Sequence, residues 1–289
     1  SRFQQKLWSI FRFSIHLAAK IEVKPCQVDK WLLGELDRLI KTVTASMEGY
    51  QFDEAFKAIR VFAWEILADN YIELVKTRLY SSDSPEKHAA QNTLFFVIET
   101  LMRLMAPFTP FISEEIYYSL IGKSVHDQNW PKPLGYGVDP AGSQIKDIAA
   151  ALRRYKAEKG FALNARLPGI IVYSELELET FDLQGAANSA VEIRKGKPEI
   201  DLRSIGIKPQ MKFLGPKFKD KSGKIILALN GMSPPEVARQ KANGTIRVCV
   251  DGEIIEIAPD AVEIVIETLS EGEAVDVLKV GEASVLVKR

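Results

Sequence analysis

Apolar residues recur at helical spacing through the first half of the chain. Leu7, Phe11 and Ile15 are four residues apart, which places their side chains on one face of an α-helix. Three longer apolar stripes of the same kind follow, over residues 32–47, 56–79 and 94–105. Long helices joined by short turns pack as an up-and-down bundle. The first half is therefore predicted to be all-α.

Turn-forming residues separate these stripes. Gly49 follows the first long stripe, and a glycine commonly ends a helix. Residues 81–85, Ser-Ser-Asp-Ser-Pro, combine a turn with the start of a helix. Thr109 and Pro110 form another start, because proline fits the first helical position, where its missing N–H is not needed.

Proline and glycine become frequent between residues 125 and 142, which makes this stretch the best candidate for a linker. The pattern before it is helical, whereas the pattern after it mixes helices and strands. We therefore predict a helical domain over residues 1–125, a linker over 126–144 and a second domain over 145–289. The predicted fold class is multi-domain, an all-α up-and-down helical bundle followed by an α+β C-terminal domain.

Short β patterns alternate with helices in the second half. Asp251-Gly252 lies between two alternating apolar runs and predicts a tight hairpin, because such a turn needs positive φ at its central residues. A final strand pair is expected around Gly281. The other predicted elements are strands in 167–173 and 190–193 and helices over 145–158, 234–241 and 260–269.

Charge narrows the choice of partners. Lys plus Arg and Asp plus Glu are equal at 38 each, so a nucleic-acid surface has to arise from local clustering of cations. Two distant cysteines and three isolated histidines offer no closely spaced zinc ligands, so no metal site is predicted, and they fit a reducing cytoplasm. No apolar run is long enough for a membrane span. The start without Met, inside a helical pattern, is typical of a piece of a longer protein.

Two segments resemble phosphate-binding loops without meeting their requirements. Gly122-Lys123-Ser124 ends like one, but Tyr117 stands where the loop needs its first glycine. Residues 219–224, Lys-Asp-Lys-Ser-Gly-Lys, are better explained as the solvated start of a helix. The sequence also contains no nucleophile elbow and no paired-histidine zinc motif. We therefore predict no catalytic residues and no cofactor for this chain.

Three clusters of cations and aromatic rings are candidates for binding RNA. Unpaired bases stack on aromatic rings and guanidinium groups, and phosphates are bound by rows of positive charge. The candidates are Arg2, Trp8, Arg12 and Phe13 on the first helix, Lys76 and Arg78 on a later one, and Arg153, Arg154, Lys156 and Lys159 after the linker. The spacing of the last group predicts a row on one helix face. The structural alternatives are rings in the core, ion pairs within one helix, and a solvated face.

Several of these segments resemble the anticodon-binding domain of class I valyl-, isoleucyl- and leucyl-tRNA synthetases. The most specific signatures are residues 69–76, Asp-Asn-Tyr-Ile-Glu-Leu-Val-Lys, and residues 105–115, Met-Ala-Pro-Phe-Thr-Pro-Phe-Ile-Ser-Glu-Glu. Further similar segments are Lys6-Leu7-Trp8, Arg12-Phe13, residues 29–33, residues 50–55 and Trp130-Pro131. Residues 153–156 and 159–165 are similar to archaeal-type valyl enzymes, whereas residues 215–218 also occur in archaeal isoleucyl relatives.

The resemblance implies that the chain is a C-terminal part of an archaeal-type valyl-tRNA synthetase whose helical bundle reads the anticodon of tRNA(Val). It also implies that the full-length parent ligates valine to tRNA with ATP and Mg, in a catalytic domain that this chain lacks and contacts. The α+β tail is expected to touch the tRNA body or to brace the bundle. The alternatives are the equivalent region of an isoleucyl or leucyl enzyme and a stand-alone synthetase-like module that binds tRNA or another partner.

Overall fold

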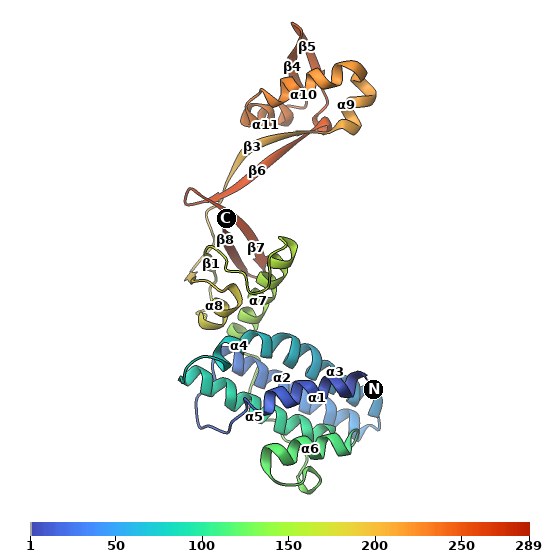
Figure 1. Cartoon of the computed structure of the whole chain (residues 1–289), viewed down its shortest axis with the longest axis vertical. Helices are drawn as coiled ribbons and strands as arrows, with labels where there is room; N and C mark the ends of the chain where they lie inside the picture. Colours follow the sequence, from blue (N-terminus) through green and yellow to red (C-terminus); the bar gives the residue numbers. More distant parts are fainter. Residues whose placement is uncertain (1) are drawn as a thin grey trace. The chain divides into compact units, whose positions relative to one another are not determined.

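The computed structural model describes residues 2–289, with the side chains of all of them except 2–7 and 13. The chain forms two compact units (Figure 1). The first unit contains the residues up to 197 and residues 278–285, and the second contains residues 198–277 and 286–289. In chain order, the second unit therefore interrupts the first.

Residues 2–121 of the first unit form helices and the connections between them, as the apolar stripes predict. They are α1 (Arg2–Ile15), α2 (Gln27–Glu48), α3 (Phe52–Val61), the π-helical η1 (Phe62–Ile72), α4 (Glu73–Leu79), α5 (Pro85–Met105) and α6 (Pro110–Ile121). Proline occupies the start of α5 and of α6, and the Ser84 hydroxyl caps α5 by accepting from the Lys87 N–H at 3.2 Å.

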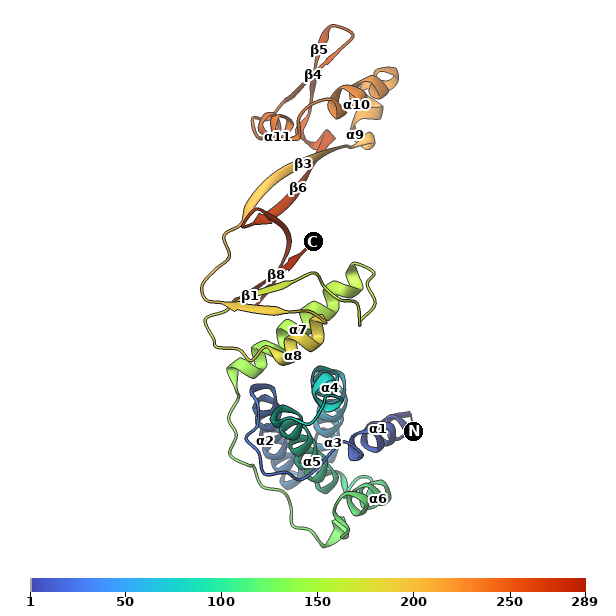
Figure 2. The same cartoon turned by 60° about the vertical axis from the view of Figure 1, so that its left-hand side comes forward.

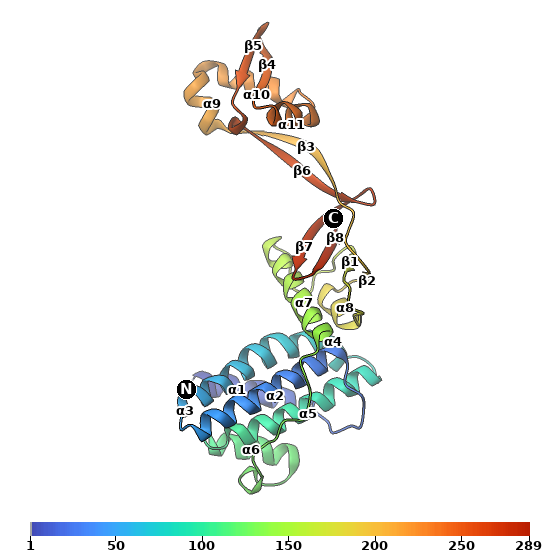
Figure 3. The same ribbon diagram turned by 180° about the vertical axis from the view of Figure 1, so that it is seen from behind.

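The helices pack through the apolar stripes that the sequence shows. Leu32 and Leu36 of α2 and Leu94 and Leu101 of α5 are fully buried. α2 contacts α3, η1 and α5, and these helices lie side by side in the two opposite views of Figure 1 and Figure 3. Burial of each leucine side chain contributes about 2 kcal/mol, so the apolar stripes stabilise the helical part.

The stripe over residues 56–79 is predicted as one helix, but η1 interrupts it. A π-helix has five-residue spacing between hydrogen-bonded groups and rarely exceeds one turn. The side chain of Asn70 follows the same spacing, because its amide donates to the Glu65 carbonyl at 2.7 Å. The wider turns change which side chains face inward, and they leave Tyr71 fully buried while Trp64 is partly exposed.

Three further helices and a parallel strand pair complete the first unit, together with part of the last hairpin. They are the short η2 (Val125–Asp127), α7 (Pro140–Glu158), β1 (Ile170–Tyr173), α8 (Phe181–Ala187) and β2 (Val191–Arg194). β1 pairs in parallel with β2, from Ile170 opposite Val191 to Tyr173 opposite Arg194, and β8 (Ala283–Lys288) is its other neighbour. α7 and α8 lie together on one side of β1 (Figure 2).

The predicted linker does not separate the compact units. α7 packs on α2, and α8 packs on α4, so the elements up to β2 belong with the helical part. The linker itself is fixed to α2, because the Asp37 carboxylate accepts from the N–H groups of Leu134 at 2.5 Å and Tyr136 at 2.6 Å. The Pro/Gly-rich stretch is therefore an extended segment that is hydrogen-bonded to α2. The division between the two units falls near residue 198.

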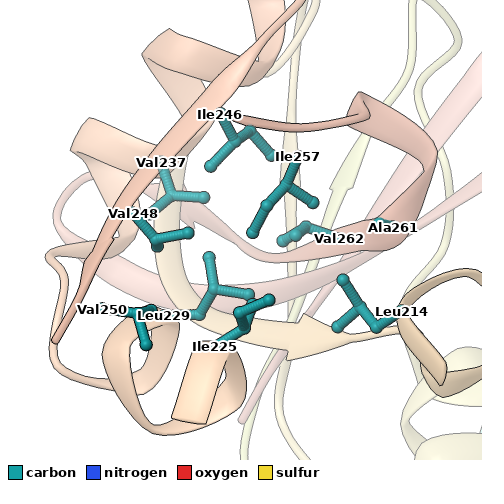
Figure 4. Close-up of a cluster of buried hydrophobic side chains, with 10 residues drawn as sticks. All are labelled: Leu214, Ile225, Leu229, Val237, Ile246, Val248, Val250, Ile257, Ala261 and Val262. Carbon is teal, nitrogen blue, oxygen red and sulfur yellow. The ribbon is translucent and has the colours of Figure 1, made fainter. Parts of the chain in front are cut away.

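The second unit consists of strands and short helices. They are β3 (Asp201–Pro209), α9 (Met211–Phe218), η3 (Lys219–Lys221), α10 (Ser222–Asn230), α11 (Pro234–Ala242), β4 (Ile246–Val250), β5 (Glu253–Ile257), η4 (Pro259–Ala261), β6 (Val262–Ser270) and much of β7 (Glu273–Val280). Its core contains Leu214 of α9, Ile225 and Leu229 of α10, Val237 of α11 and residues of β4 to β6 (Figure 4).

The hairpin prediction is confirmed, and one helix prediction is wrong. β4 and β5 pair around Asp251 and Gly252, whose φ angles are 52° and 83°. Residues 260–269, predicted as a helix, form η4 and then β6. β6 pairs antiparallel with β3 along its whole length, from Asp201 opposite Leu269 to Pro209 opposite Val262. The paired residues of β3 and β6 lie some sixty positions apart in sequence, so the local pattern of residues 260–269 did not reveal the strand.

We predict that Gly142→Ala destabilises the first unit. Alanine normally stabilises a helix by up to about 1 kcal/mol over glycine, but a Cβ on Gly142 would overlap the Gln27 carbonyl and lie 2.8 Å from Cβ of Trp31. Forcing α7 away from α2 costs about 1–3 kcal/mol, which urea unfolding followed by circular dichroism measures. Gly137→Ala is the control, since its Cβ would meet nothing within 4 Å. A more stable Gly142→Ala protein would contradict this packing.

Candidate nucleic-acid interface

Arg78, a predicted RNA contact, lies instead at the centre of a buried ion network. Its guanidinium donates to both oxygens of Asp29, at 2.9 and 3.1 Å, and its Nε donates to Asp182 Oδ1 at 2.8 Å. The Tyr71 hydroxyl donates to Asp29 Oδ1 at 2.7 Å. Arg78 is 5% exposed and Asp29 is 0% exposed. The guanidinium therefore has no surface for RNA, and the prediction for Arg78 is corrected to a structural role.

The network ties together four elements, α2, η1, α4 and α8. The Asp29 carboxylate accepts four hydrogen bonds, since the Cys26 N–H also donates to Oδ2 at 2.9 Å. Asp182 has only the Arg78 bond, and its Oδ2 is buried without a partner among the described residues. Burial raises the pKa of Asp182 to about 7, against the opposing effect of Arg78. Burial also raises the pKa of Tyr71, with the Asp29 charge as the next cause.

Lys156 is a second predicted RNA contact that the structure places inside. Its side chain is fully buried, and its ammonium donates to the carbonyls of Leu163 and Ala186, both at 2.9 Å. Burial lowers the pKa of Lys156. The row predicted for Arg153, Lys156 and Lys159 is consequently interrupted at its centre. The physical reason is that a long aliphatic stem can cross apolar surface and deliver its charge to buried carbonyls.

Arg153 and Arg154 point to different surroundings. Arg153 is partly buried and donates to the Asp69 carbonyl at 3.1 Å and to Asn70 Oδ1 at 3.4 Å, and desolvation lowers its pKa. It thereby joins α7 to the end of η1. Arg154 is exposed and lines a hollow of about 650 Å³ with Asp147, Lys279 and Glu282. Adjacent positions on a helix face different directions, so the pair does not form one patch.

Lys76 and Arg153 do come together. Both line a groove of about 680 Å³ between α4, α7 and α8, together with Tyr80 and Leu163. Lys76 is exposed, and its ammonium lies 3.7 Å from Glu73, which is also half-exposed. Lys159 is exposed as well, with its ammonium 5.5 Å from the centre of the Tyr155 ring. The groove is therefore amphipathic, with cations at its edge.

The first helix presents part of the predicted cluster to solvent. Trp8 is 38% exposed and Arg12 is exposed, whereas Phe11 between them is fully buried. Trp8 and Arg12 are four residues apart and share a face. The side chains of Arg2 and Phe13, also predicted contacts, lie outside the described residues. The outward orientation of Trp8 distinguishes it from a core residue, as RNA stacking would require.

A second tryptophan–arginine pair, which the sequence reasoning missed, lies on the elements that follow α2. Arg60 and Trp64 line a hollow of about 290 Å³ with Val61 and Glu65, and α1 contacts η1, the element that carries Trp64. The same four-residue spacing that singled out Trp8 and Arg12 could have identified this pair. Two guanidinium and two indole groups on neighbouring elements suit stacking with unpaired bases.

No group of three or more His, Cys, Asp or Glu side chains in the described part of the chain is placed to hold a metal ion. No described helix is both long enough and apolar enough to cross a bilayer.

Comparison with known proteins identifies relatives along the whole chain. Residues 29–171 match the family described as the anticodon-binding domain of tRNA ligase. The chain is 57% identical over its full length to a valine–tRNA ligase of Methanothrix thermoacetophila, 46% to one of Methanosarcina barkeri and 41% to one of Archaeoglobus fulgidus. It covers 33%, 35% and 35% of these proteins, so it spans about a third of the length of the curated relatives it matches.

We predict that Arg78→Met destabilises the first unit by about 3–5 kcal/mol, because it leaves the buried Asp29 carboxylate without its cation and Asp182 without its hydrogen-bond partner. Lys76→Met, on the same helix, is the control, since the exposed pair with Glu73 contributes at most about 1 kcal/mol. Urea unfolding monitored by circular dichroism compares the two. Equal losses would show that the buried network is not a main source of stability.

The raised pKa of Asp182 also predicts that the free energy of unfolding depends on pH. Its pKa is raised from 3.8 to about 7, so the folded state keeps a proton that the unfolded state has released. The associated stability is full below about pH 4 and is lost as pH rises through 7. Unfolding free energy should therefore fall over this range, and Asp182→Asn should flatten the decline. Asp147→Asn, at an exposed position, should leave it unchanged, and an unaltered decline in Asp182→Asn would contradict the assignment.

Proposed function

We propose, from the match of residues 29–171 to the anticodon-binding domain of tRNA ligases, that the chain is the tRNA-binding portion of a valine–tRNA ligase. The predicted resemblance to archaeal-type valyl enzymes is confirmed by relatives that match the chain from end to end. The observation that carries the proposal is this full-length similarity, which includes the second unit as well as the helices. Because these relatives are named valine–tRNA ligases, we propose tRNA(Val), and not an isoleucine or leucine tRNA, as the partner of this chain.

In the proposed function, the helices form an up-and-down bundle whose exposed rings and guanidinium groups read unpaired anticodon bases. Trp8 with Arg12 and Arg60 with Trp64 are the described groups that suit this task best. Lys76, Arg154 and Lys159 are exposed cations that would bind phosphates nearby. A chain of zero net charge can do this because its cations are presented at particular places, not because of its total.

The longer protein would supply the chemistry. We propose that it ligates valine to tRNA(Val) in the cytoplasm, using ATP and Mg, and that this chain contacts the catalytic domain that performs the reaction. The role proposed for the chain is orientation, since binding energy at the anticodon holds the distant acceptor end for reaction.

Binding of tRNA tests the proposal directly. Filter binding should show salt-sensitive affinity of this chain for a tRNA(Val) transcript and a weaker affinity when only the anticodon is changed. Equal affinity for every tRNA would reject anticodon reading, and no measurable affinity would reject RNA binding by this chain.

We predict that the double substitution Arg12→Gln with Arg60→Gln weakens tRNA(Val) binding by about tenfold or more, since each arginine contact typically contributes about 1–3 kcal/mol. It should also reduce the discrimination between the natural and altered anticodons. The control is Lys24→Gln with Lys132→Gln, which removes the same charge from two exposed positions that line none of these hollows. If both pairs lower affinity equally, the effect is one of general charge and the assigned face is wrong.

A further inference from the structure

The π-helix η1 is longer than its own backbone explains. It runs over eleven residues, Phe62–Ile72, and the residues at both of its ends have ordinary right-handed helical angles. A π-helix is normally confined to a single turn inside an α-helix, and such turns are frequent at functional sites. Contacts from outside the backbone hydrogen-bond ladder are therefore expected to hold η1 in its wide form.

Two side chains provide such contacts near the end of η1. The Asn70 amide donates to the Glu65 carbonyl at 2.7 Å, so it spans the same five residues as a π-helical backbone bond. The guanidinium of Arg153, on α7, donates to Asn70 Oδ1 at 3.4 Å and to the Asp69 carbonyl at 3.1 Å. One amide thus accepts from α7 and donates within η1. We call Glu65, Asn70 and Arg153 the η1 clamp.

Arg153 is itself fixed in position. The helix that carries it, α7, packs on α2 and contacts η1. Its side chain is partly buried, and desolvation lowers its pKa against the opposing charges of Glu73 and Asp69. The oxygens on η1 replace part of the water that this guanidinium has lost. Arg153 is consequently a fixed point from which the end of η1 is oriented.

The η1 clamp acts on the backbone directly beside Trp64. Glu65 follows Trp64 in the chain, and both line the hollow of about 290 Å³ that also contains Arg60. Phe62 on one side of this stretch and Tyr71 on the other are buried in the core. A change from five-residue to four-residue spacing shifts the register by one residue, which rotates side chains by about 100°. Because the buried residues stay in the core, this rotation would fall on the residues between them and turn Trp64 away from Arg60.

We propose that Asn70 and Arg153 are positioning residues for anticodon reading, which keep η1 in its wide register and so aim Trp64 beside Arg60. Neither residue touches the RNA in this role. Both act through the indole, which stacks on an unpaired base. The inference rests on the proposed function for the identity of the ligand. It adds a reason why Arg153, an arginine in a basic segment, is directed at η1.

Asn70→Leu tests this role, because it removes both hydrogen bonds of the amide without changing the charge. Binding of a tRNA(Val) transcript to the whole chain should weaken by about tenfold, as for one lost stacked base. The affinity ratio between the natural and an altered anticodon should fall, while the slope of log affinity against log salt stays unchanged. Asn129→Leu, the same replacement at an exposed position of the first unit, should alter none of these. Discrimination by Asn70→Leu equal to that of Asn129→Leu would overturn the proposal.

A double-mutant cycle separates positioning from a general loss of stability. If Asn70 acts through the indole, the double variant Asn70→Leu with Trp64→Ala should bind tRNA(Val) within twofold of Trp64→Ala alone. Additive losses would show that Asn70 acts independently of Trp64, against the proposal. Circular dichroism verifies that each variant is folded, and Arg153→Met replaces Asn70→Leu in the cycle if the latter does not fold.

Arg153→Met distinguishes positioning from direct phosphate binding. Positioning predicts weaker anticodon discrimination at a nearly unchanged salt slope. A lost phosphate contact predicts equal weakening for all tRNAs and a slope shallower by about 1, which would overturn the proposal. If Asn70→Leu and Arg153→Met bind like the unaltered chain while Arg12→Gln with Arg60→Gln weakens binding, the positioning role fails and the proposed function stands. An unaltered chain without affinity for tRNA would reject both.

Discussion

The guanidinium of Arg78 is the interaction on which the arrangement of the first unit depends. Asp29, Arg78 and Asp182 belong to three helices that are distant in sequence, and burial removes the water that would otherwise satisfy their charges. A buried cation without its carboxylates is far costlier than a buried pair. Helix η1, which carries Trp64, and helices α4 and α8, which line the groove around Lys76, are consequently held together with α2 by a polar centre, which adds geometric specificity to the apolar packing of α2 and α5.

Much of the helical architecture could be predicted from local pattern. Apolar stripes, Ser84 before a helix and Pro110 at a helix start depend on residues within a few positions of each other. The π-helical turns of η1 and the pairing of β6 with β3 could not, because each depends on contacts made elsewhere in the fold. The same limit explains the unit boundary, since Gly142 fits against Gln27 only once α7 has packed on α2.

The candidate interface was predictable in composition but not in orientation. Trp8, Arg12, Lys76, Arg154 and Lys159 are exposed, as RNA contacts must be, although their role in binding stays a prediction. Arg78 and Lys156 carry the same charge in similarly basic segments, yet each is buried. Arg78 binds the side chains of Asp29 and Asp182, and Lys156 donates to two backbone carbonyls. Sequence shows where cations are dense, whereas the partition between neutralised and available charge depends on the three-dimensional neighbours.

The interruption of the first unit by the second has a consequence for biosynthesis. β1 has β8 as one of its neighbours in the sheet, although residues 198–277 of the other unit are translated between them. During synthesis, β1 and β2 leave the ribosome long before that edge can be covered, while residues 198–277 already have a core of their own to form. An exposed strand edge invites pairing with other chains. The nascent polypeptide is thus most vulnerable to misassembly in the interval between completion of β2 and arrival of β8.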